Sequence, residues 1–335
     1  MDLFENPFCL LGLSARSTRE EIMEAADVAS LSWDPDRAAD AAAALTSPRK
    51  RLSAEIFFLP GQDKAGAAWI LGSYQNQIRR VEPCRWVSAL AAVNITAAAL
   101  SRLVDDGLGM TAYGVRLLSN AFESADAKGV MAFINSDRQL AGIPAVPSIS
   151  DVEEEMDKLR LYCREVVKGA LDRLPSRELT AAADQVVLTE TDRGRRPPPV
   201  LVRDLMEIYD LETKAFFDRE EANVKWLCWA LKATAADKGQ ARKARGMASD
   251  LEKVLWNWES VAAPLLTFHE STGGMHRPTV AVALAVREVA VDICKPEESF
   301  GLGEILMLML SRIFAGATEV SEIAEEGRRW IVGRR

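Results

Sequence analysis

The sequence predicts an all-α protein, and three observations lead to that fold class. Apolar residues recur at helical spacing along most of the 335 residues, whereas alternating β-branched runs are nearly absent. Alanine, leucine, glutamate and arginine, which favour helices, are abundant. Glycine and proline interrupt the pattern at a few points, such as Pro60-Gly61 and Gly273-Gly274. We therefore expect an N-terminal helical hairpin, further helical hairpins and a C-terminal helical domain.

The N-terminal region, residues 1–61, is expected to begin its hairpin near Ser17. The run Ser17-Thr-Arg-Glu-Glu21 has a serine-to-glutamate spacing close to that of a capping box. In a capping box, two side chains satisfy backbone N–H groups that a helix start leaves free. This start predicts a helix that continues to about Trp33.

Two further helices should complete this region. Asp34 followed by Pro35 is typical of an N-cap and a first helical residue, and the helix should extend to about Leu45. Thr46 or Ser47 is expected to cap the next helix, which has Pro48 at its start. That helix should end by Pro60-Gly61, because this pair breaks helices.

Residues 62–192 are expected to form a second helical domain. Its predicted helices cover 64–81, 84–105, 110–124 and 126–141, with breaks at Glu82-Pro83, Gly107–Gly109 and Gly142–Pro144. Ser150 or Asp151 should cap a further helix, because glutamates follow directly and the helix dipole favours acidic residues near its start. The basic, proline-rich stretch 193–199 ends in three prolines, which exclude a helix, and is interpreted as a linker.

Residues 200–335 are expected to form the C-terminal helical domain. The predicted helices cover 200–236, 240–262, 277–294, 300–315 and 317–332. Four tryptophans lie on the first two of these helices: Trp226, Trp229, Trp256 and Trp258. We expect them to pack in the core between the two long helices. The alternative is a docking surface, if one of them proves to be exposed.

The composition argues against several classes of protein. The net charge is −8 and the pI is about 5.1, whereas general binding to nucleic acids or to anionic membranes needs clustered basic residues. No secretory signal is visible, and the longest apolar run, Ile305–Leu310, is far shorter than the ~20 residues that span a bilayer. Five dispersed cysteines indicate a reducing, cytoplasmic location.

No catalytic motif is visible. The two histidines, His269 and His276, flank a Gly-Gly turn and are interpreted as residues of a polar loop, because no nearby ligands complete a metal site. Gly301-Leu-Gly303 lacks the third glycine of a dinucleotide-binding loop, and neither a P-loop pattern nor a Gly-x-Ser-x-Gly pattern occurs. We therefore expect no cofactor, no metal and no enzymatic activity.

Four blocks of the N-terminal region, within residues 6–60, follow one another in a familiar order. They are Asn6-Pro-Phe-Cys-Leu-Leu-Gly-Leu13, the helix start at Ser17, Asp34-Pro35-Asp36 and Thr46-Ser-Pro-Arg-Lys-Arg51. In this order they resemble a J-domain, the helical-hairpin module that recruits DnaK-type chaperone ATPases. In that family the tripeptide His-Pro-Asp caps the loop between two antiparallel helices. Here Asp34 replaces the histidine, while Pro35 and Asp36 are kept.

The chain also departs from the family around this tripeptide. The helix before it, Arg19–Asp27, is acidic, whereas the family's is basic, and the loop and helix after it are shorter. A carboxylate at Asp34 cannot act as the hydrogen-bond donor that an imidazole provides. We therefore expect that ordinary ATPase stimulation is lost, and that any partner has a complementary basic surface.

The resemblance implies a non-enzymatic, co-chaperone-like adaptor. Its contact loop would consist of Asp34, Pro35, Asp36 and Arg37, and would engage a DnaK-type chaperone or a divergent protein partner, while the body of the chain binds a client or an assembly. Two alternatives stay open. One is a structural or regulatory scaffold in which the J-like unit is only a relic, and the other is an enzyme whose site is spread across several helices. The oligomeric state is not predicted.

Overall fold

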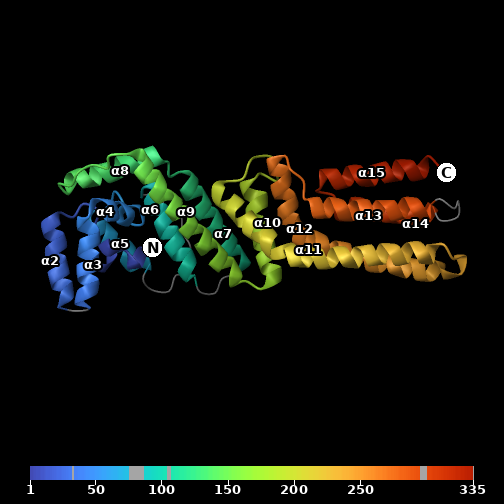
Figure 1. Ribbon diagram of the computed structural model, residues 1–335, viewed down its shortest axis with the longest axis horizontal. Coiled ribbons are helices and arrows are strands. Elements are labelled where there is room, and N and C mark those ends of the chain that lie inside the picture. The colour runs from blue at the N-terminus through green and yellow to red at the C-terminus, as the bar shows by residue number, and fades with distance from the viewer. Residues whose placement is uncertain (32–33, 75–86, 104–106, 295–299, 335) are drawn as a thin grey trace. The chain divides into compact units, whose positions relative to one another are not determined.

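The computed structural model describes residues 1–31, 34–74, 87–103, 107–294 and 300–334. All regular structure in these residues is helical, which confirms the predicted all-α class (Figure 1). Besides the α-helices, the described residues include two short 3-10 helices, η1 (Leu3–Glu5) and η2 (Lys238–Gln240).

The first of two compact units comprises Met1–Ala182 together with Pro199–Leu205. Its helices are α1 (Pro7–Leu10), α2 (Arg19–Ser30), α3 (Pro35–Thr46), α4 (Pro48–Ile56), α5 (Lys64–Tyr74), α6 (Ala89–Arg102), α7 (Leu108–Glu123), α8 (Ala127–Leu140) and α9 (Ile149–Asp172). The expected N-terminal region, residues 1–61, therefore shares one compact unit with most of the expected domain 62–192.

The second compact unit comprises Ala183–Pro198 together with Met206–Arg335. It contains α12 (Ala241–Thr272), α13 (Arg277–Ile293), α14 (Phe300–Ile313) and α15 (Thr318–Val332), while α10 (Ser176–Glu190) and α11 (Val200–Ala235) contribute to both units. Within the expected linker 193–199, the chain forms a hydrogen-bonded turn. The Arg193 N–H donates to the Leu188 carbonyl at 2.7 Å, and the Arg196 N–H donates to the Thr191 carbonyl at 2.9 Å.

The N-terminal hairpin consists of α2 and α3, which lie side by side at the blue end of Figure 1. Phe8, Ile22, Leu45 and Phe58 are fully buried and form the centre of its core. The Asn6 side chain caps α1 and also donates hydrogen bonds to the carbonyls of Ala54 and Phe57, at 2.8 and 3.0 Å. The Asn-Pro-Phe block therefore joins the start of the chain to the end of α4.

Several helices start one to five residues from the predicted position; α6, for example, starts at Ala89 and not at 84, and α2 and α9 use a different cap. The capping box at α2 is formed by Thr18 and Glu21, whereas Ser17 is buried before the helix starts. Helix α9 is capped by Ser148 and not by Ser150 or Asp151. Several hydroxyl and carboxyl side chains stand next to each other at both starts. Because any of them can cap a helix, only the backbone conformation selects one.

The ends of the predicted helices also need adjustment. Helix α12 continues to Thr272, ten residues beyond the predicted end at 262, and ends at Gly273 in the left-handed conformation that glycine adopts without strain. Pro264 lies inside α12 and is buried with Leu265. Packing therefore carries the helix past a proline that removes one backbone N–H. The expected helix end at Trp33 and the break at Glu82-Pro83 lie outside the described residues.

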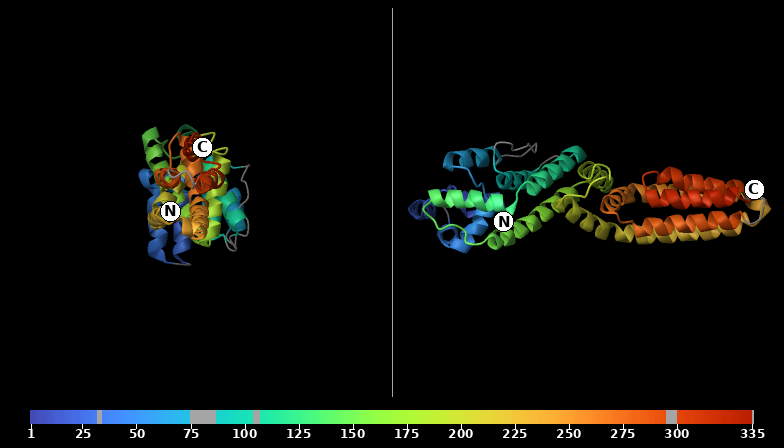
Figure 2. Two further views of the ribbon diagram at one scale, coloured as in Figure 1. Left: turned by 90° about the vertical axis from the view of Figure 1, so that its right-hand side faces the viewer. Right: turned by 90° about the horizontal axis from the view of Figure 1, so that it is seen from above.

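The second unit is organised around α11 and α12. Leu251, Leu255 and Trp258 recur at helical spacing along α12 and are fully buried. The views in Figure 2 show α13, α14 and α15 grouped against the α11–α12 pair, and α12 contacts α14 directly. The turn between α11 and α12, which contains η2, leaves the ends of both helices at the surface.

Candidate partner-contact surface

The residues expected to contact a partner form the start of α3. The Asp34 carboxylate accepts a hydrogen bond from the Asp36 backbone N–H at 3.0 Å, and Pro35 occupies the first turn of the helix. Asp34, Pro35, Asp36 and Arg37 are all exposed. The predicted N-cap is thus confirmed, and the four expected contact residues lie together on the surface.

The outer side of α2 continues this surface. Leu31 is 87% exposed, and Met23 and Val28 are also exposed large apolar residues. At 100° per residue, these positions fall on the same side of α2 as the exposed carboxylates of Glu24 and Asp27. We call Glu20, Met23, Glu24, Asp27, Val28 and Leu31 the acidic face. It combines negative charge with exposed apolar area, which is a typical composition of a protein-binding surface.

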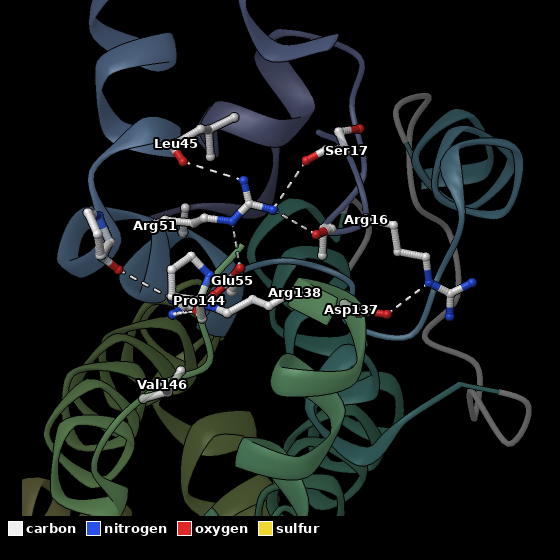
Figure 3. A network of polar contacts seen from close by, with 12 residues as sticks. Arg16, Ser17, Leu45, Arg51, Glu55, Asp137, Arg138, Pro144 and Val146 are labelled. Carbon is white, nitrogen blue, oxygen red and sulfur yellow. Dashed lines mark hydrogen bonds and ion pairs between the residues drawn. The ribbon is translucent and has the colours of Figure 1, made fainter. Parts of the chain in front are cut away.

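A buried network of charges holds the hairpin in place (Figure 3). The Arg51 side chain is only 1% exposed and forms an ion pair of 2.8 Å with Glu55. The other oxygen of Glu55 accepts a hydrogen bond of 2.9 Å from Arg138 on α8. Arg51 also donates to the carbonyls of Ala15 and Leu45, at 2.8 and 3.4 Å. Burial raises the pKa of Glu55, an effect that the two arginines oppose.

A second ion pair lies beside this network. The Arg16 Nε atom donates to Asp137 on α8 at 2.8 Å, and the Gly61 backbone N–H donates to the other oxygen of Asp137 at 2.6 Å. These contacts and the Glu55–Arg138 bond join residues 1–61 to α8. Arg51, which the J-domain resemblance places in a basic cluster with Arg49, is therefore a core residue and is not available to a partner.

A cavity of about 570 Å³ opens beside the acidic face. Residues of α2, the end of α3, Arg51 and the segment after α8, from Leu140 to Pro144, line it. Its wall includes Glu20, so the cavity and the acidic face are continuous. An apolar side chain of a bound partner would find a recess there.

The two histidines do not lie in a polar loop, contrary to the sequence-based interpretation. His269 is in the last turn of α12, and His276 is buried at the start of α13. Their rings stack with centroids 5.8 Å apart. Burial lowers the pKa of His276 to about 4, and the neighbouring His269 adds to this effect. Such a histidine is neutral near pH 7 and packs as part of the core.

One ring nitrogen of His276 takes part in a buried hydrogen-bond chain. Its Nδ1 atom lies 2.7 Å from the Thr279 hydroxyl, which also accepts a hydrogen bond of 2.9 Å from the Trp258 indole N–H. The sequence did not reveal this chain of contacts, because Trp258 and Thr279 are 21 residues apart. Among the described residues, no group of three or more His, Cys, Asp or Glu side chains is arranged to hold a metal ion.

The expectation that all four tryptophans pack in the core is wrong for three of them. Trp258 is fully buried, but Trp226, Trp229 and Trp256 are 60%, 68% and 43% exposed. Trp226 and Trp229 are three residues apart and share one side of α11. Exposed tryptophans favour the alternative, a docking surface.

In the part of the chain that the structure describes, none of the helices has both the length and the apolar character needed to cross a bilayer. No protein family, curated protein or solved structure matches this chain. Its function must therefore be argued from the surfaces described above.

Proposed function

We propose that this chain is a non-enzymatic adaptor that binds a protein partner through the acidic face and the contact loop Asp34–Arg37. The observation that carries this proposal is the 87% exposure of Leu31 on the side of α2 that also bears the carboxylates of Glu24 and Asp27. An isolated protein gains nothing from a leucine in water, whereas a partner would bury it. The buried network joins the hairpin that carries this surface to α4 and α8.

The partner class follows from charge and from the J-domain resemblance. The resemblance suggests a DnaK-type chaperone or a divergent relative of one. The carboxylates of the acidic face and of Asp34 and Asp36 require that the contacting surface of this partner be basic. Because a carboxylate replaces the family's imidazole, the adaptor would tether the partner without stimulating its ATPase in the ordinary way.

Affinity capture from native extract tests the adaptor role. Two variants are compared with the wild type. The first carries Leu31→Ser and Glu24→Lys and disrupts the acidic face. The second has alanine at Asp34, Pro35 and Asp36 and disrupts the contact loop. We expect a DnaK-type ATPase to be enriched roughly tenfold by the wild type over both variants. The matched control is Leu161→Ser on α9, which changes an equally apolar side chain that is 60% exposed. Equal recovery with the wild type and both surface variants would refute the proposal.

The exposed tryptophans support a second candidate, a scaffold whose J-like hairpin serves only the fold. In that case the Asp34–Asp36 sequence persists because it caps α3, and partners bind through the second unit. Deleting residues 1–61 does not separate the candidates, because the deletion would leave Arg138 and Asp137 buried without their partners. Instead, partner recovery that survives both acidic-face variants but fails with Trp229→Ala would favour the scaffold.

A further inference from the structure

The regions around two of the connections between helices carry charges of opposite sign. Residues 20–40, around the α2–α3 turn, contain seven carboxylates and one arginine. Residues 225–245, around the α11–α12 turn, contain six lysines or arginines and one aspartate. The basic stretch stands out because the whole chain has a net charge of −8. Each stretch therefore creates a local potential that attracts the other.

The basic side chains near the start of α12 are exposed and form no ion pairs with the rest of the described chain. Arg242, Lys243 and Arg245 are exposed, and none of them has an ion-pair partner among the described residues. They lie in the first turns of a helix, where the dipole disfavours cations by some tenths of a kcal/mol each. Lys225 and Lys232, in contrast, pair with Glu221 and Asp292. Three unpaired cations at an unfavourable position are a feature that an anionic partner would explain.

Exposed apolar side chains lie among the charges of both the acidic and the basic region. Trp229 lies on the same side of α11 as Lys225 and Lys232, and Trp226 lies beside it on the exposed surface of the helix. We call these four residues, with Arg242, Lys243 and Arg245, the basic face. The acidic face presents Met23, Val28 and Leu31 among its carboxylates in the same manner. Large apolar residues surrounded by charges are the usual composition of a protein interface, in which aromatic residues contribute most of the affinity.

We propose that the acidic face of one molecule docks on the basic face of a second copy of this chain. The complementarity of charge and the paired apolar residues are both present in the one sequence, so a second copy of the chain offers a matching surface. The contact joins two different surfaces and is therefore heterologous. It covers the surface to which the adaptor's partner binds, so that self-association and partner binding compete.

Charge-reversal variants of the full chain test this contact. Glu20→Lys with Glu24→Lys reverses the acidic face, and both positions lie outside the capping box. Arg242→Glu with Arg245→Glu reverses the basic face. Sedimentation velocity and light scattering, from micromolar to sub-millimolar concentration at low salt, measure the mass. We expect the wild type to associate with increasing concentration, and either double variant to weaken this association roughly tenfold or more.

The decisive measurement is whether combining the substitutions restores self-association. The chain that carries all four substitutions has complementary faces of exchanged sign and is expected to associate again. An equimolar mixture of the two double variants keeps one intact acidic and one intact basic face, and should form a heterodimer. Trp229→Ala should weaken the wild-type association, and high salt should weaken it further.

Matched controls reverse charges elsewhere. Glu153→Lys with Asp157→Lys changes two exposed carboxylates near the start of α9, and Arg328→Glu with Arg329→Glu changes two exposed arginines of α15. Both controls should associate like the wild type, and circular dichroism should show that all variants are folded.

Three outcomes would overturn the proposal. The first is a wild type that stays monomeric throughout, and the second is association that is equal in all variants. The third is a monomeric wild type that binds phosphatidylglycerol vesicles and loses this binding with Arg242→Glu/Arg245→Glu, which would assign the basic face to a lipid surface. These measurements use purified protein alone. A negative result here would therefore refute self-association without refuting the adaptor role, which affinity capture tests.

Discussion

At the scale of single residues, Asp34 illustrates how a family signature and local helix chemistry overlap. The sequence identified Asp34 both as the replaced histidine of a J-like tripeptide and as an N-cap. The structure confirms the cap through its hydrogen bond to the Asp36 N–H. The cap explains why an aspartate is stable there, whereas the exposure of the surrounding residues makes the position available to a partner.

His276 allows a prediction at the same scale. Its pKa is about 4 in the folded chain, against an ordinary value of 6.5. Between these values the unfolded chain binds more protons, so stability should be retained above pH 6.5 and fall as the pH decreases to 4, by roughly 3 kcal/mol in total. Urea unfolding of the wild type and of His276→Gln across this range measures the effect.

The difference in unfolding free energy between the wild type and His276→Gln isolates this residue from other titrating groups. It should be largest above pH 6.5 and shrink towards pH 4. A difference that stays constant over the whole range would show that the burial of His276 does not govern acid stability.

At the scale of helices, the caps and the packed faces decide where each element begins and ends. Thr18 and Glu21 start α2, and Gly273 ends α12. The start of α2 is predicted from the sequence within two residues, because its cap is a local signal. Helix α12 shows the limit of such signals, because it continues through the buried Pro264 to Thr272, ten residues beyond the predicted end at 262.

Asp34→Ala tests the cap of α3. The substitution removes the acceptor for the Asp36 N–H and is expected to reduce stability by about 1 kcal/mol, whereas Asp34→Asn should retain most of it. Chemical unfolding followed by circular dichroism measures both variants. If Asp34→Ala is as stable as the wild type, the tripeptide is not kept for capping, and partner contact becomes its principal explanation.

At the scale of the whole molecule, long-range contacts define which parts of the chain fold together. The sequence suggested a separate N-terminal domain of residues 1–61, but the structure includes this region in the first compact unit. The bond between Glu55 and Arg138 spans 83 residues. A buried carboxylate between two arginines must be satisfied on both sides, so the hairpin and α8 depend on each other.

Glu55→Ala tests this dependence. The substitution leaves the guanidinium groups of Arg51 and Arg138 buried without their carboxylate, and should destabilise the first unit by roughly 3–5 kcal/mol. Thermal and urea unfolding measure the loss. Glu154→Ala is the matched control, because it removes an exposed carboxylate that pairs with Lys158 at the surface. Equal effects of the two substitutions would contradict a structural role for the buried network.

The sequence by itself determined the all-α class, most of the helices other than α1 and α10, and the cap at Asp34, because hydrophobic spacing and capping chemistry act over a few residues. Only the tertiary structure decided which polar and aromatic residues are buried. Arg51 and His276 are inside, and Trp226 and Trp229 are outside, since burial depends on partners that lie tens of residues away. The candidate contact surfaces depend on the same long-range contacts. The local sequence around a tryptophan does not show whether its side chain faces the core or water.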